Sequence, residues 1–204
     1  MPKGNLKEPL HPTVAVSDAF MATCAFYAAR VSGAKPESQL GFFVCGMACT
    51  FGVLRFGFAP ETFRPFNETF ARLTGQVGVP MMGLGFLNTD ASLRSMIPLA
   101  SDLEILVALV VTFAFASALP AARAELVTTL LSAVSMGAIF KVAGANSGAV
   151  GDKYFLAQLG VGLFVFGGLA IKPDRNRCLF GVRRENLFHY CLGVSLALMA
   201  QATF

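Results

Sequence analysis

Charged and strongly polar side chains are rare inside the apolar parts of the sequence, and each is a candidate for chemistry. Asp18 lies about a turn and a half into the first apolar stretch, where a carboxylate could bind a proton, a cation or a ligand amine. The alternative is that Ser17 and Asp18 cap the true start of that helix. Gln76 and Gln158 are candidate ligands for a substrate or ion, or hydrogen-bond partners between helices.

A metal site has one candidate set of ligands. His189 stands near the start of the last apolar stretch, and Cys45 and Cys49 lie four residues apart on one helix face. Imidazole and thiolate are zinc ligands, but a lone histidine at a helix start is also compatible with an interfacial position. Nothing in the sequence brings the cysteines beside His189. No local catalytic signature appears, so the sequence predicts no catalytic residue and no cofactor, and it allows a bound lipid.

The amino-acid composition indicates that most of these residues lie in a membrane and not in water. Of the 204 residues, 55% are hydrophobic and 14% are charged, whereas a soluble domain carries about 25% charged residues. The mean hydropathy is +0.63, which is too high for one water-soluble core of this size. The basic residues are spread through the loops and do not form a nucleic-acid surface. We therefore expect an all-α, polytopic transmembrane helical bundle with the lipid bilayer as its main partner.

Seven apolar stretches can be marked, and they predict a single domain over residues 1–204 with a polar tail at residues 1–12. A spanning helix needs about 20 residues, so flanking residues must extend the shorter stretches. The third is the least regular, because it contains Gln76, Pro80 and several glycines. The stretches are Thr13–Ala29, Leu40–Leu54, Leu73–Leu87, Ile105–Ala122, Leu126–Phe140, Tyr154–Ile171 and Leu187–Phe204.

The distribution of basic residues predicts the orientation. With seven spans, eleven of the 16 lysines and arginines fall on the amino-terminal side of the membrane and five on the opposite side. Loops on the cytoplasmic side carry the excess of positive charge. The N-terminus should therefore face the cytoplasm, or the matrix of an organelle, and the C-terminus the far side. Arg55 and Lys141, at span ends, are expected to snorkel toward water.

Residues 61–73 form an amphipathic segment between the second and third stretches. Phe63, Phe66, Phe70 and Leu73 recur at helical spacing between polar side chains, as in helices that lie in a membrane interface. The segment includes Asn67 in a formal glycosylation sequon, which the predicted orientation leaves unmodified. Small residues also recur at helical spacing, as they do where membrane helices pack closely.

Three short stretches together resemble a known family. They are His11–Thr13 followed by Ser17–Asp18, Gly57–Pro60 at the end of the second span, and Glu185–His189 at the start of the seventh. With seven helices, they resemble the alkaline ceramidase and adiponectin receptor superfamily of membrane hydrolases. That resemblance implies a serine, an aspartate and three zinc-binding histidines acting on lipid amides or esters. The chain has two histidines in all, and Gly193 stands where an H-x-x-x-H pair would have its second histidine.

These observations favour a non-catalytic multi-pass membrane protein. Such a protein would act by packing, as an accessory subunit of a membrane assembly, through self-association, or by binding lipid within its bundle. One alternative is a transporter or channel for a small molecule or ion, in which Asp18, Gln76 and Gln158 converge on a cavity. The other is a lipid amide or ester hydrolase of the superfamily that the chain resembles.

Overall fold

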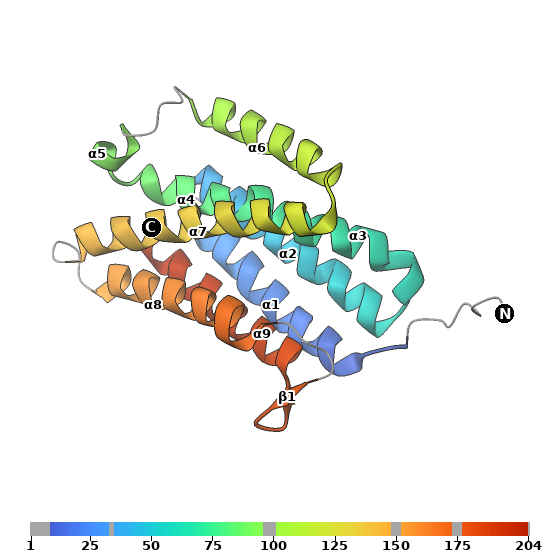
Figure 1. The fold of residues 1–204 in the computed structure, drawn as a ribbon. Helices are drawn as coiled ribbons and strands as arrows, with labels where there is room; N and C mark the ends of the chain where they lie inside the picture. Colours follow the sequence, from blue (N-terminus) through green and yellow to red (C-terminus); the bar gives the residue numbers. More distant parts are fainter. Residues whose placement is uncertain (1–8, 33–34, 96–100, 148–151, 173–176, 204) are drawn as a thin grey trace.

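The computed structural model describes residues 9–32, 35–95, 101–147, 152–172 and 177–203, and most of them are helical (Figure 1). The all-α expectation is confirmed, and residues 1–8 of the expected polar tail lie outside the described part of the chain. The helices are α1 (Pro12–Val31), α2 (Pro36–Gly57), α3 (Pro60–Leu73), α4 (Val79–Leu87), α5 (Ala91–Arg94), α6 (Asp102–Ser117), α7 (Ala121–Asn146), α8 (Asp152–Phe166) and α9 (Arg184–Ala200). Before α9, the strands β1 (Cys178–Leu179) and β2 (Val182–Arg183) form a small antiparallel hairpin.

Four helical segments are long and apolar enough to cross a membrane. They are α1, α2, α7 and the segment Lys153–Ile171, which joins α8 to the π-helical turn η2 (Gly167–Ile171). The helices α6 and α9 are shorter, with 16 and 17 residues. By length and composition the chain therefore fits an integral membrane protein.

The third apolar stretch and the amphipathic segment before it belong to one helical rod. The π-helical turn η1 (Thr74–Gly78) joins α3 to α4, and the backbone at both junctions stays right-handed helical. Phe66 and Phe70 face α2, where their ring centroids lie 5.5 and 4.9 Å from that of Phe51. Part of the amphipathic stripe thus packs lengthwise against another helix. Its place at the membrane surface stays a prediction.

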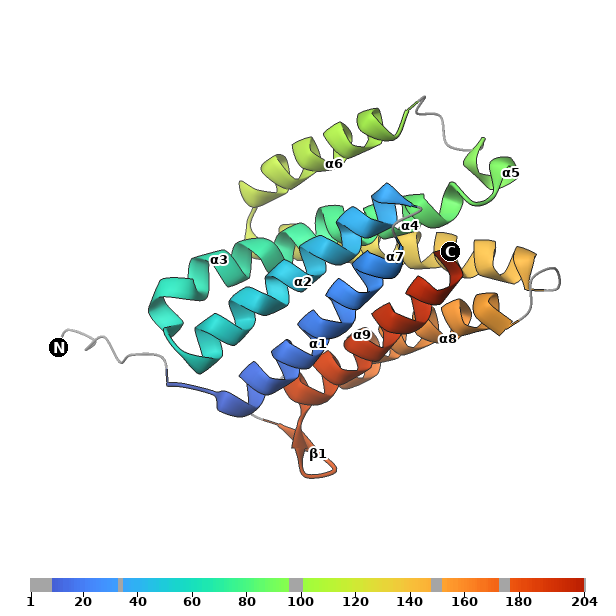
Figure 2. The same cartoon turned by 180° about the vertical axis from the view of Figure 1, so that it is seen from behind.

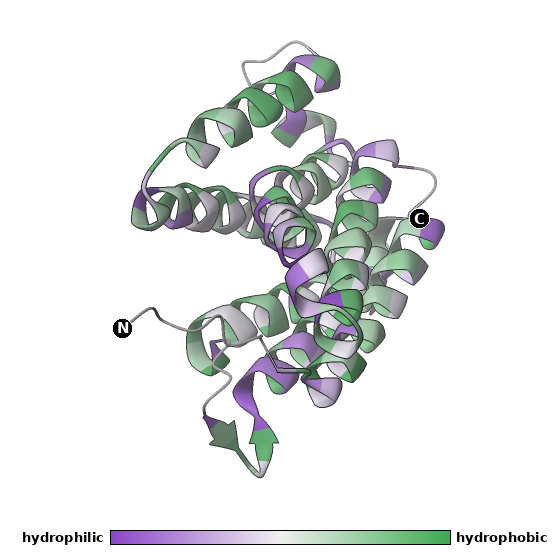
Figure 3. Cartoon of the chain, turned by 90° about the vertical axis from the view of Figure 1, so that its right-hand side faces the viewer, coloured by the Kyte–Doolittle hydropathy of each residue, from purple (hydrophilic) through white to green (hydrophobic). Residues whose placement is uncertain are grey.

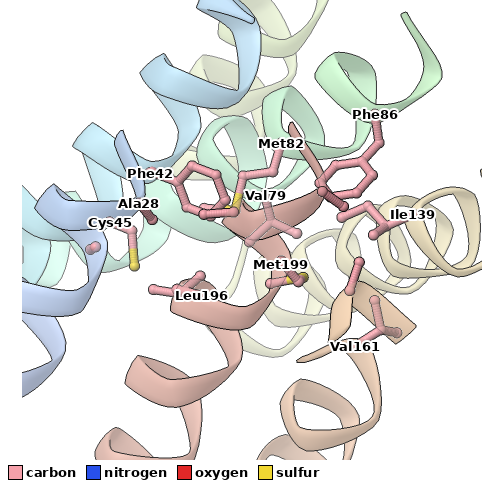
Figure 4. Close-up of a cluster of buried hydrophobic side chains, with 14 of the residues drawn as sticks. Ala28, Phe42, Cys45, Val79, Met82, Phe86, Ile139, Val161, Leu196 and Met199 are labelled. Atoms are coloured by element: carbon pink, nitrogen blue, oxygen red, sulfur yellow. The ribbon is translucent and has the colours of Figure 1, made fainter. Parts of the chain in front are cut away.

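The helices form a ring. Figure 2 shows α1 between α2 and α9, and the contacts continue from α9 to α8, from α8 to α7, and from α7 through α4 back to α2. The middle of the ring is filled by apolar side chains that include Phe42, Met82, Ile139 and Met199, all fully buried (Figure 4). Each helix therefore has one face that is fixed by this core.

Small residues allow two helix pairs to approach closely, as the sequence predicts. A Cβ atom on Gly41 of α2 would meet the carbonyl oxygen of Gly78 and would lie 2.7 Å from the Cγ atom of Met82. A Cβ atom on Gly160 of α8 would lie 2.8 Å from the carbonyl oxygen of Ser195 in α9. Larger side chains at these two positions would push the helices apart.

Helix α6 lies outside the ring, against η1, α4 and α7. In Figure 3 it is the helix at the top of the view, and it is green, hence apolar, over most of its length. It buries Leu109 and Ala116, whereas Phe115 remains 73% exposed. A helix this apolar and this exposed needs apolar surroundings, which a bilayer supplies.

Polar contacts fix the start of α6 to the end of α4. The Nη2 atom of Arg94 lies 2.8 Å from the Oδ1 atom of Asp102, the first residue of α6. The side chain of Asn88 donates a hydrogen bond of 2.9 Å to the same carboxylate. Nearby, the hydroxyl of Ser92 donates to Asp90 and, with backbone N–H donors, holds the pKa of that carboxyl below its usual range.

Candidate functional site

The candidate site is a buried group of polar side chains between α1 and α9, which we call the polar cluster: Ser17, Asp18, Asn186 and His189. The Oδ1 atom of Asp18 lies 3.2 Å from the Nδ1 atom of His189. The Oγ atom of Ser17 lies 3.1 Å from the same ring nitrogen and 3.4 Å from the Oδ1 atom of Asn186. Asp18 is 4% exposed, and the His189 side chain 14%. Buried polar groups inside a helical bundle need partners of this kind.

The directions of the two helices bring these residues together. Asp18 comes six residues after the start of α1 at Pro12, and His189 comes five residues after the start of α9 at Arg184. Because α1 and α9 lie side by side and begin at the same end of the bundle, the two positions have the same depth (Figure 2). The alternative that Ser17 and Asp18 cap the helix start is wrong, since α1 begins before them.

Helix α2 completes the surroundings of Asp18. A Cβ atom on Gly52 would meet the Oδ2 atom of Asp18, so the carboxylate occupies the space that glycine leaves. Cys49, one turn earlier on α2, is also buried. Three helices thus meet at one carboxylate, which makes Asp18 the centre of the site.

Replacing Gly52 with alanine tests this fit. The added methyl group would force the Asp18 carboxylate to move, and overpacking of this kind destabilises by about 1–3 kcal/mol. Gly137→Ala is the matched control, because a Cβ atom at Gly137 of α7 has open space around it. We expect a lower thermal unfolding temperature in detergent for Gly52→Ala and no decrease for Gly137→Ala. Equal behaviour of the two variants would contradict the contact.

A second polar contact closes the same end of α1 against the hairpin. The Nδ1 atom of His11 lies 3.3 Å from the Nη1 atom of Arg183 in β2. The backbone N–H of His11 donates a hydrogen bond of 2.8 Å to the carbonyl oxygen of Phe56 at the end of α2. The start of α1 is therefore fixed to both neighbouring chain segments, which positions Ser17 and Asp18.

The geometry decides which chemistry the polar cluster supports. In a serine–histidine–aspartate relay, serine and aspartate contact opposite ring nitrogens, so that a proton passes through the imidazole. Here Ser17 and Asp18 both contact Nδ1 of His189. This arrangement binds the two helices to each other through one ring nitrogen and does not form a relay.

The residues present do not fit the three-histidine zinc site that the family resemblance implies. A Cβ atom at Gly193 would lie 2.8 Å from the ring of Phe20, so an imidazole has no room there. Among the described residues, no three histidine, cysteine or acidic side chains gather in a way that would hold a metal ion. His189, Cys45 and Cys49 are all described, and they do not form such a group.

The two candidate glutamines lie elsewhere in the bundle. Gln76 sits in η1 and donates a hydrogen bond of 2.9 Å to the hydroxyl of Thr128 in α7. Gln158, in α8, has its Nε2 atom 3.1 Å from where a Cβ atom on Gly144 of α7 would lie. Neither contacts Asp18 in the structure. The convergence that the transporter hypothesis requires does not occur among these three residues.

Arg55 is a buried residue whose role the sequence did not reveal. The expectation that it snorkels is wrong, because it is 6% exposed. Its Nη1 atom donates a hydrogen bond of 3.1 Å to Oδ1 of Asn67 and lies 3.5 Å from Oε1 of Glu68, both in α3. The amide nitrogen of Asn67 donates in turn to the carbonyl oxygen of Ala48. These bonds engage both ends of the Asn67 amide, which gives a second reason to expect no glycan there.

In comparisons with known proteins, no family model, curated protein or solved structure matches the chain.

Proposed function

We propose that the chain is a seven-span membrane protein with its N-terminus on the cytoplasmic side. The spans would be α1, α2, the part of the rod formed by η1 and α4, then α6, α7, α8 and α9, with α3 at the membrane interface. Three observations support this: four segments long and apolar enough to cross, the alignment of the rod with α2, and the exposed apolar face of α6. The excess of basic residues on the amino-terminal side supports the orientation.

We further propose that the protein is not an enzyme and acts by packing within the bilayer, holding lipid or a membrane-protein partner against its bundle. One observation carries this proposal: Ser17 and Asp18 share a single ring nitrogen of His189. The polar cluster then serves to join α1 to α9 and to fix which faces of the bundle remain for lipid and partner. Polar contacts between membrane helices commonly have this role.

The native mass of the protein after mild detergent extraction tests this proposal. We expect the chain to carry phospholipid or a protein partner in fixed stoichiometry and no bound zinc, with the same stoichiometry in wild type and Cys49→Ser. Measurement of metal content in the same sample completes the test. One zinc per chain, lost on replacement of His189, would contradict the non-catalytic role.

A second candidate function is the lipid amide or ester hydrolase. It is favoured only by the presence of Ser17, Asp18 and His189 at one site, since the resemblance implies a serine, an aspartate and a seventh-span histidine there. The geometry of their contacts and the missing histidines count against it. Release of fatty acid from a ceramide or ester by the purified chain, abolished by Asp18→Asn, would establish it. Absence of release, together with the absence of zinc, would leave the packing role.

A further inference from the structure

A pocket of about 530 Å³ opens on the surface between α3, α7 and the connection from α6 to α7. It is separate from the polar cluster, since none of its lining residues belongs to α1, α2 or α9. Charged side chains from α3 and α7 line it, together with small residues. The lining residues include Glu68, Arg72, Leu119, Ala124, Glu125 and Thr128.

The α7 side of this pocket is fixed by contacts with η1. Gln76, 1% exposed, donates hydrogen bonds from its Nε2 atom to the hydroxyl of Thr128 at 2.9 Å and to the carbonyl oxygen of Ala124 at 3.4 Å. A Cβ atom on Gly75 would meet the methyl group of Thr128, so η1 and α7 are in close contact here. The pocket therefore has a preformed wall, as ligand sites usually have.

The fold sets the depth of the pocket in the membrane. Residues 118–120 join the apolar helices α6 and α7, so in the proposed seven-span arrangement this corner must lie at the boundary between hydrocarbon and water. Leu119 belongs to the corner and lines the pocket. The pocket thus lies at the level of the lipid headgroups, and this step rests on the proposed function.

The charges at the pocket are of both signs. Glu68 is already paired, with Arg64 at 2.9 Å and with Arg55 at 3.5 Å. Within the part of the chain that the structure describes, Arg72 and Glu125 form no ion pair with another protein side chain. One cation and one anion are therefore available on opposite walls of the pocket, on α3 and α7. This pattern matches a zwitterion better than an anion or a cation.

The two helices that meet at the corner also carry exposed apolar side chains. Phe115 and Val111 on α6 are exposed, and so are Leu126 and Leu130 on α7. In the proposed orientation this surface faces the hydrocarbon region, where it contacts acyl chains. A ligand with a zwitterionic headgroup and two apolar chains fits both the charged pocket and the apolar surface of α6 and α7.

We propose that this pocket binds the headgroup of a zwitterionic phospholipid with a primary ammonium group, with the phosphate on Arg72 and the ammonium on Glu125. A guanidinium donates paired hydrogen bonds to phosphate oxygens, and a primary ammonium donates to a carboxylate. The same headgroup chemistry exists in free phosphoethanolamine, which lacks the acyl chains. The lipid binds more tightly because its chains lie on α6 and α7.

Native mass spectrometry of the purified full chain tests this site. The lipids are phosphatidylethanolamine and phosphatidylglycerol with identical acyl chains, and the third ligand is free O-phosphoethanolamine. We expect wild type to retain phosphatidylethanolamine at least about fivefold better than phosphatidylglycerol, because loss of one charge-assisted contact weakens binding by about this factor or more. Free O-phosphoethanolamine should bind far more weakly. Equal retention of the two lipids, or equal binding of the free compound, would overturn the proposal.

Two variants and a matched control identify the residues. Glu125→Gln should weaken phosphatidylethanolamine binding by about tenfold and remove the discrimination between the two lipids, because only phosphatidylethanolamine has an ammonium group. Arg72→Ala should weaken the binding of both lipids by about tenfold and leave the discrimination in place, because both carry the phosphate. Arg123→Ala, an exposed cation on α7 that does not line the pocket, should leave the binding of both lipids unchanged. Unchanged binding in Arg72→Ala and Glu125→Gln would exclude the pocket. Such a result would not change the measured metal content or the energetic coupling between Asp18 and His189. It can therefore be distinguished from a failure of the proposed function, which those two measurements test.

Discussion

Replacing His189 with leucine should lower the free energy of unfolding by about 2–3 kcal/mol, because it removes the polar contacts of a buried imidazole with an acidic side chain and a hydroxyl. The imidazole contacts the buried Asp18 carboxylate and the Ser17 hydroxyl through one nitrogen. Leucine fills similar volume and offers neither contact. The change is measured by unfolding the purified protein in mild detergent with increasing fractions of a denaturing detergent.

A conservative variant separates the loss of hydrogen bonding from the loss of packing. His189→Gln keeps a polar side chain that can reach Ser17 or Asp18, and it should lose about half as much free energy or less, since one hydrogen bond is worth about 1 kcal/mol. If glutamine and leucine at this position were equally destabilising, the effect would come from the shape of the ring and not from the polar cluster.

The second large effect is expected at the contact between α2 and α3. Replacing Asn67 with leucine removes a hydrogen-bond partner from the buried Arg55 guanidinium and the donor to the carbonyl oxygen of Ala48. Bonds to charged groups are worth about 1.5–3 kcal/mol each, so the unfolding free energy should decrease by about 2–3 kcal/mol. The same detergent titration measures it.

Two further variants make this prediction specific. Thr69→Leu is the matched control, because Thr69 lies on the exposed side of α3 and should tolerate the change. Arg55→Met should be less damaging than Asn67→Leu, since it removes the buried charge together with its need for partners. If Arg55→Met were clearly less stable than Asn67→Leu, the prediction for this contact would be wrong.

The helices themselves follow from the sequence, and their limits do not. The first apolar stretch, Thr13–Ala29, corresponds closely to α1 at Pro12–Val31. The second, Leu40–Leu54, falls short of α2 at Pro36–Gly57, because the polar residues of its first turn continue the helix beyond the apolar part. Hydropathy detects contact with lipid, whereas helix limits depend on backbone hydrogen bonds.

The third stretch shows a different limit of sequence analysis. Gln76 and Pro80 suggest an interruption, yet the chain stays helical from α3 through η1 into α4. Gln76 lies within the wider π-helical turn, and Pro80 follows this turn directly, at the point where the hydrogen-bond pattern changes from π-helical to α-helical. Local residue preferences alone did not predict this continuity, because tertiary contacts with α2 and α7 support it.

Two of the four residues of the polar cluster were singled out from the sequence, but their contact was not. Asp18 and His189 stand out as polar residues near apolar stretches, but spacing along the chain cannot tell that the first and last helices are neighbours. Arg55 has the same limitation: the sequence places it at a helix end, and only packing gives it Asn67 as a partner. Ring order in a helical bundle is a tertiary property.

The most direct measurement for the joining of α1 to α9 is a double-mutant cycle on Asp18 and His189. The free energy of unfolding is measured for wild type, Asp18→Asn, His189→Leu and the double variant, and a second cycle pairs Asp18→Asn with Gln158→Leu. We expect a coupling of at least about 1 kcal/mol between Asp18 and His189 and additivity within about 0.5 kcal/mol between Asp18 and Gln158. Additive effects in the first cycle would contradict the contact on which the polar cluster and the proposed function depend.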